Sequence, residues 1–105
     1  MSLQFSLDDV KFLTRAKTVA GAVTIGITPV RVLSINTTRR IAIITNDSAL
    51  DIYIGFNNSI TINSGIRINA LGGSFMFGLF TDTPWCGEIW AVAAGAGNNL
   101  TFVEV

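Results

Sequence analysis

The chain has 105 residues, with seven basic and seven acidic side chains, so its formal net charge at neutral pH is zero. This length fits one domain with a single core, and the balanced charge gives no bulk electrostatic reason to expect a nucleic-acid partner. Charged residues make up 13% of the chain, against about 25% in typical soluble domains, and the mean hydropathy is +0.54. We therefore expect something other than water to cover part of the surface.

The residue types that usually build metal sites and disulfides are scarce. Cys86 is the one cysteine, which permits no internal disulfide, and the chain has no histidine, so the usual zinc ligands are missing. The apolar runs are shorter than the about 18 to 20 residues that span a bilayer. No charged n-region followed by an apolar h-region opens the chain. We expect no cofactor and no membrane span, and synthesis in a cytoplasm.

Residues 1–17 predict an N-terminal arm or short helix, and they carry five of the 14 charged side chains. Ser6 is a typical helix cap, and Asp8 and Asp9 suit a first helical turn. Phe12 and Leu13 belong to a short apolar stripe. Two interpretations stay open: the segment packs on its own domain, or it docks on a neighbouring subunit.

Residues 18–105 predict one β domain, because short segments with period-two alternation recur between Gly, Pro, Asn and Ser. In chain order the strand-like segments are 18–27, 30–35, 41–45, 52–56, 60–62, 66–70, 75–79, 87–94 and 100–105. About eight short antiparallel strands at this spacing indicate an all-β sandwich or barrel, jelly-roll-like in architecture.

We expect residues 39–56 to organise this domain. Ile41, Ile43 and Thr45 share one face of the first run, and 52–56 form the second. The connection 46–49 has turn chemistry, so we predict that the two strands pair as an antiparallel hairpin. Residues 95–99 predict another hairpin turn.

Several predicted strands are apolar on both faces, which leaves a surplus of hydrophobic side chains on the predicted outer face. These are Ile44, Tyr53, Met76, Phe80, Trp90, Val92, Val103 and Val105. An exposed patch of this kind marks an interface, and a symmetric homo-oligomer would bury it. Arg39 and Arg40 could form an ion pair across that contact and fix its orientation. The candidate interface residues are Phe12, Leu13, Arg39, Arg40, Ile44, Tyr53, Trp90 and Val103.

Catalytic chemistry finds little support in the sequence. The carboxylates of the β domain lie on scattered loops and strand faces, without the spacing of an acid and base pair. Cys86 has no histidine partner, so an inert thiol is favoured over a nucleophile. Trp85, Trp90 and Tyr53 could stack on sugar rings, although core or interface packing explains their apolar neighbourhood better. We expect a protein that is not an enzyme.

Several segments resemble a recurring small β module of tailed bacteriophage virions, found in capsid decoration, head-fibre and tail accessory proteins. The resemblance lies in residues 40–46, 52–55, 64–66, 72–74 and 87–93 and in the hydrophobic C-terminal strand. It covers about the last two-thirds of the chain and contains strand and turn signals without a chemical motif. Residues 1–38 fall outside it.

The resemblance implies a non-enzymatic virion component, often a homotrimer, that sits on a capsid or tail surface. We expect a capsid-stabilising decoration protein whose partners are its own copies and the major capsid protein or another virion protein. The alternative is a carbohydrate-binding head-fibre or tail accessory module.

Overall fold

A computed structural model describes residues 19–78 and 85–105, and these residues form eight β-strands. The strands are β1 (Val19–Ile25), β2 (Val30–Leu33), β3 (Ile41–Asn46), β4 (Ile52–Gly55), β5 (Ile66–Ile68), β6 (Ser74–Gly78), β7 (Ile89–Ala93) and β8 (Asn98–Glu104). The arm predicted at residues 1–17, with Phe12 and Leu13, lies outside the described residues. The described residues contain no helix with the length and hydrophobicity that a bilayer-spanning helix needs.

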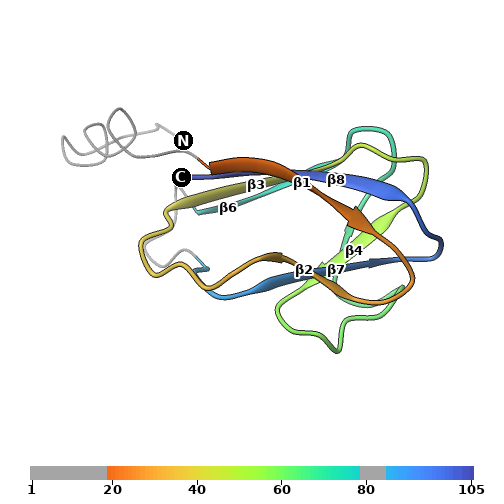
Figure 1. Ribbon diagram of the computed structural model, residues 1–105, viewed down its shortest axis with the longest axis horizontal. Coiled ribbons are helices and arrows are strands. Elements are labelled where there is room, and N and C mark those ends of the chain that lie inside the picture. The colour runs from red at the N-terminus through yellow and green to blue at the C-terminus, as the bar shows by residue number, and fades with distance from the viewer. Residues whose placement is uncertain (1–18, 79–84) are drawn as a thin grey trace, which may run out of the picture.

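The strands form two four-stranded antiparallel sheets that face each other as the layers of a sandwich (Figure 1). Sheet A has the order β1-β8-β3-β6, and sheet B has the order β2-β7-β4-β5. This is the strand order of a jelly roll, in which most connections pass from one sheet to the other. The prediction of an all-β, jelly-roll-like sandwich is confirmed.

The predicted hairpin at residues 39–56 is wrong, because β3 and β4 belong to different sheets. β3 pairs with β6 and β8, whereas β4 pairs with β5 and β7. Asn46 explains why the chain crosses over: it is fully buried, and its Nδ2 donates hydrogen bonds to the backbone oxygens of Leu50 (2.8 Å) and Ile68 (2.9 Å). The turn chemistry at 46–49 therefore builds an arch between the sheets.

The connection from β7 to β8 is a second arch, so the hairpin predicted at residues 95–99 is also wrong. Asn98 is buried, and its Nδ2 donates to the backbone oxygens of Ile25 (3.0 Å) and Gly95 (2.6 Å). Residues 60–62, predicted as a strand, instead belong to the loop between β4 and β5.

The core fills the space between the two sheets, and its placement reverses the predicted faces of β3. Ala42 and Ile44 point inward with no exposed surface, whereas Ile43 points outward and is 37% exposed. A strand that is apolar on both faces does not specify which face turns inward, and a shift of one residue exchanges them. Ile44 is therefore a core residue, which corrects its assignment to the interface.

Candidate interaction surfaces

Arg39 is buried and joins the two sheets at one end of the sandwich. Its Nε donates to Glu104 Oε1 at 2.6 Å, and Nη2 donates to Ser34 O at 2.6 Å. Nη1 donates to the backbone oxygens of Trp85 (3.1 Å) and Gly87 (3.0 Å). These contacts connect the end of β8 in sheet A to the chain segments beside β2 and β7 in sheet B. The ion pair predicted across a subunit contact is instead formed within the chain, which corrects the interface assignment of Arg39.

Two neighbours of Arg39 that the sequence singled out lie in the same region. Arg40 is exposed, and its backbone N–H donates to Val105 O at 2.8 Å, so it extends the pairing of β8 with β3. Cys86 is half-buried, and its Sγ lies 3.4 Å from Arg39 O as a hydrogen-bond donor. Both residues thus take part in closing this end of the sandwich.

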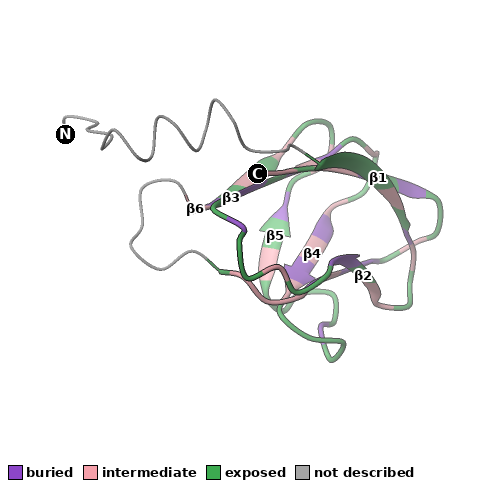
Figure 2. Cartoon of the chain, turned by 60° about the vertical axis from the view of Figure 1, so that its left-hand side comes forward, coloured by how far each residue is buried: buried purple, intermediate pink, exposed green. Residues whose placement is uncertain are grey.

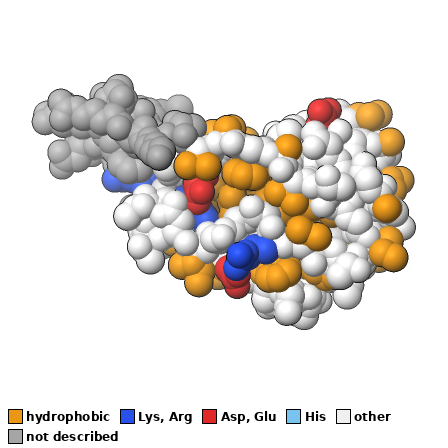
Figure 3. All heavy atoms as spheres, in the orientation of Figure 1, with side chains coloured by type: hydrophobic (Ala, Val, Ile, Leu, Met, Phe, Trp, Pro, Cys, Tyr) orange, Lys and Arg blue, Asp and Glu red, His pale blue; other side chains and the backbone are white. Residues whose placement is uncertain are grey.

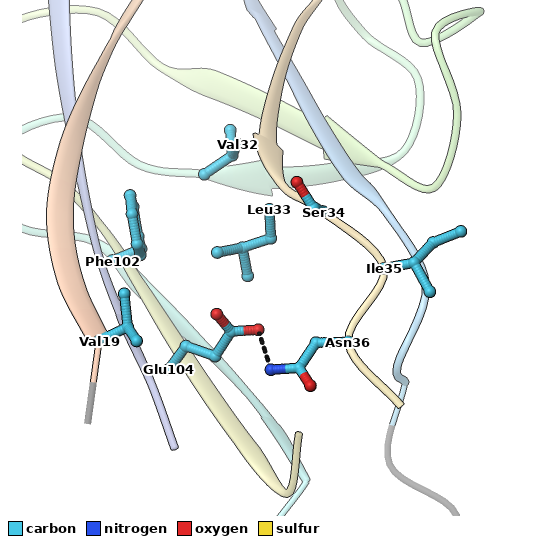
Figure 4. Close-up of a pocket in the computed structure, with 8 residues that line it drawn as sticks. All are labelled: Val19, Val32, Leu33, Ser34, Ile35, Asn36, Phe102 and Glu104. Carbon is cyan, nitrogen blue, oxygen red and sulfur yellow. Dashed lines mark hydrogen bonds between the residues drawn. The ribbon is translucent and has the colours of Figure 1, made fainter. Parts of the chain in front are cut away.

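We use the name Arg39 clamp for Arg39 together with the groups that it binds on Glu104, Ser34, Trp85 and Gly87. A pocket of about 330 Å³ opens beside this clamp, between β1 and β8 on one side and β2 on the other. Figure 4 shows apolar walls with Glu104 and Asn36 side by side, where Asn36 Nδ2 donates to Glu104 Oε1 at 3.1 Å. The lining residues are Val19, Val32, Leu33, Ser34, Ile35, Asn36, Phe102 and Glu104. Because Arg39 and Asn36 both bind Glu104 Oε1, this carboxylate takes part in closing the end of the sandwich, and the pocket wall combines apolar with polar side chains.

The outer face of sheet B is covered by the loop between β4 and β5, residues 56–65. Ile60 in this loop is only 7% exposed. A Cβ added at Gly55 or Gly65 would come within 2.8 Å or 2.4 Å of Ile60 Cδ1, so the side chain fits where both glycines leave space. Gly65 also has a φ of 81°, which favours glycine. The loop thus closes down on its own sheet.

The predicted interface residues of sheet B lie beneath or beside this cover. Tyr53 is half-buried, and its hydroxyl hydrogen-bonds Asn63 Oδ1 at 3.1 Å. Trp90 is half-buried between Arg31 and Gly55 in the strand register. Its Nε1 is buried without a hydrogen-bond partner among the described residues. The structure therefore places both aromatic rings partly within the chain's own packing.

Charged side chains border this covered face. Arg31 Nη1 pairs with Glu88 Oε2 at 3.1 Å near the surface, and Arg67 is exposed on the edge strand β5. A second pocket, of about 370 Å³, lies between the loop and the sheet and is lined mostly by apolar atoms of residues 27, 29, 58–62 and 92–94. Sheet B therefore combines its own covering loop with a charged rim.

The outer face of sheet A is different, because its outward-pointing positions among the described strand residues include no charged side chain. The strand register aligns Ala20, Val103, Ile43 and Met76 in one row across all four strands. Val103 and Ile43 are each 37% exposed, and Met76 is 45% exposed. The adjoining row contains Ala22, Thr101, Thr45 and Ser74. The result is a flat surface of apolar and small uncharged side chains.

Of the eight predicted interface residues, Val103 lies at the centre of this face. Ile43 and Met76, which are not among these eight residues, complete the exposed row. Only the alternation of β3 could have identified Ile43, and that alternation fits either orientation of the strand. Figure 3 looks at the side of the sandwich and not onto this face, and on that side blue and red side chains lie close together among hydrophobic ones.

Phe56 and Trp85 form an exposed aromatic pair at the end of the sandwich that Arg39 closes. Their ring centroids are 4.6 Å apart, and the rings are 45% and 40% exposed. Trp85 Nε1 donates to Glu88 O at 3.0 Å, which fixes the indole on its own backbone. Of the sugar-stacking candidates, Trp85 is the one with the largest exposed fraction.

Fold and surfaces together define an eight-stranded jelly-roll domain with one covered and one uncharged outer face. Within residues 19–78 and 85–105, no group of three or more His, Cys, Asp or Glu side chains is placed to hold a metal ion. No protein-family model matches the chain, and no curated protein or solved structure matches it significantly.

Proposed function

We propose that the protein is a structural component of a bacteriophage virion, namely an oligomeric capsid decoration protein that stabilises the shell. It would be made in the host bacterial cytoplasm and would end up in the virion. Eight-stranded jelly rolls occur in viral capsid domains, but also in lectins and cupins, so the fold alone does not select this function.

The observation that carries the proposal is the uncharged outer face of sheet A. A free domain gains little from exposing Ile43, Met76 and Val103 side by side. A domain held against other protein subunits gains from burying them, at about 25 cal/mol for each Å² of apolar surface. Such a face suits a protein whose working state is an assembly.

In this proposal the uncharged face meets a capsid subunit or another copy of the chain, and the covered face of sheet B points to solvent. The charged rim of Arg31, Glu88 and Arg67 then remains hydrated. The role does not call for catalysis, because the protein would act by bridging neighbouring subunits. A homotrimer is the oligomer that the phage resemblance implies.

The proposal can be tested with particles of the phage that encodes the chain, prepared without this protein. Added protein should sediment with the particles and raise their melting temperature in scanning calorimetry. Ile43→Lys should weaken binding, because it places a charge in the centre of the uncharged face. Leu71→Lys, at a loop position that is 84% exposed, is the matched control. Failure of the unmodified protein to sediment with the particles would contradict the proposal.

A carbohydrate-binding module is the second candidate, and the exposed Phe56–Trp85 pair supports it. Aromatic rings with one open face are suited to packing against the apolar face of a sugar. A glycan array followed by titration, with tryptophan fluorescence as the readout, tests this function. A saturable response that Trp85→Ala removes and Trp90→Phe retains would support it, and the absence of any response would exclude it for the sugars tried.

A further inference from the structure

Strand β1 forms the edge of sheet A, and among the described strands only β8 pairs with it. It spans seven residues, and its register with β8 continues through seven pairs without a shift. Most of its length is exposed (Figure 2). Its sequence contains no charged residue and no proline. Proteins usually protect an edge strand with charge, proline, a bulge or short length, because its free N–H and C=O groups can pair with another strand.

The two edges of sheet B carry such protection. β2 has four residues, follows Pro29, carries Arg31 and has an irregular register between Arg31 and Leu33. β5 has three residues and carries Arg67. The other edge of sheet A, β6, has five residues and ends at Gly78, whose φ is 90°. β1 is therefore the longest of the four edge strands, and like β6 it lacks the charge, proline and irregular register found at the edges of sheet B.

The sequence around β1 reads the same in both directions. Residues 18–24 are Thr-Val-Ala-Gly-Ala-Val-Thr, with Gly21 at the centre. When a strand pairs with a second copy of itself in antiparallel orientation, opposite residues share a face of the sheet and so have the same parity. In the register centred on Gly21, each residue meets its own kind: Ala20 lies opposite Ala22, and Val19 opposite Val23.

We propose that two copies of the chain pair antiparallel through β1, about a two-fold axis at Gly21. This pairing joins two sheets A into one eight-stranded sheet and makes their uncharged outer faces continuous. The contact is isologous and therefore closes after two copies, whereas pairing of β1 with β6 of another copy would be heterologous and would form a ring or an open filament. It yields a dimer when it acts alone, and it can link larger oligomers when it acts beside another contact.

The chain's own packing allows this contact. Gly21 is exposed, and a Cβ added there would come within 2.9 Å of the Phe102 ring, which would have to shift, so the packing of the single chain already favours glycine at this position. Ala20 and Ala22 point outward and are exposed, and their partners on β8, Val103 and Thr101, are uncharged. Charges introduced at positions 20 and 22 therefore act mainly on the second copy.

Two variants with substitutions at the same two positions test the register. In A20K/A22K the introduced lysines lie opposite each other across the axis, so association should be lost. In A20K/A22E each introduced lysine lies opposite an introduced glutamate, so association should be retained. Sedimentation velocity should be measured up to about 100 µM protein, because small interfaces bind weakly. Thermal unfolding followed by circular dichroism checks that both variants fold.

Each outcome decides the inference. Association of the unmodified chain that A20K/A22K abolishes and A20K/A22E retains supports the pairing centred on Gly21. A monomeric unmodified chain overturns it, as does association that both variants retain or both lose. If both folded variants lose association, mixing A20K/A22K with A20E/A22E shows whether another antiparallel register is used. The inference does not rest on the virion role, since binding to phage particles is measured separately.

Discussion

The outer face of sheet B is closed by the chain itself, whereas the outer face of sheet A keeps Ile43, Met76 and Val103 exposed. On sheet B, Ile60 packs where Gly55 and Gly65 leave space, and arginines border the covered area. On sheet A, the outward positions of the four described strands are uncharged. Both outer faces thus have apolar side chains, but the loop of residues 56–65 covers only the outer face of sheet B.

This difference suggests how a chain with few charges can remain foldable. A loop of residues 56–65 removes one apolar face from water without any partner. The second face stays available, and its flatness and small side chains suit contact with another protein surface. The outer face of sheet A therefore has no charged side chain among its described strand residues, and the proposed contacts lie on this sheet.

The largest expected effect on the free energy of unfolding is that of replacing Arg39, because its hydrogen bonds connect the two sheets. Arg39→Met should lower the free energy of unfolding by about 3–5 kcal/mol, because it removes the ion-pair partner of the Glu104 carboxylate and the donor to three backbone oxygens. Urea unfolding followed by circular dichroism measures it. Arg67→Met, at an exposed position, should change stability little. Equal losses of stability in Arg39→Met and Arg67→Met would show that the hydrogen bonds of Arg39 do not contribute to the free energy of unfolding.

A smaller effect is expected when the cover of sheet B is removed. Ile60→Ala should cost about 2–4 kcal/mol, because it deletes a buried side chain and leaves a gap beside Gly55 and Gly65. It should also increase the binding of a hydrophobic dye. Ile62→Ala in the same loop is the control, since Ile62 is 44% exposed. A dye signal that stays unchanged in Ile60→Ala would mean that the loop does not cover the face.

The smallest effect on stability is expected on the uncovered face. Ile43→Lys should change the free energy of unfolding by less than about 1 kcal/mol, because the side chain is partly exposed and makes no polar contacts there. Dye binding and binding to phage particles should decrease. Arg67→Ile, which makes sheet B less charged, should not reproduce that decrease. A large loss of stability in Ile43→Lys would indicate that this face is already packed within the single chain.

Alternation and turn residues were sufficient to predict an all-β, jelly-roll-like sandwich and to place all eight described strands within a few residues of the structure, with one extra strand predicted at 60–62. These signals are local: period two marks a strand, and Asn, Gly and Ser mark its end. They could not show which strands pair. Asn46 and Asn98 have ordinary turn chemistry, and only their buried bonds to distant backbone oxygens turn the two connections into arches.

The sequence by itself therefore determined the type of structure, through strand periodicity and turn residues, and its single cysteine excluded an internal disulfide. The tertiary structure alone decided which face of β3 is buried, because Ile43 and Ile44 are equally apolar and only the sheet opposite selects one. It also decided that Arg39 is internal, because the carboxylate of Glu104 and the carbonyl groups that surround its guanidinium come from segments far apart in the chain.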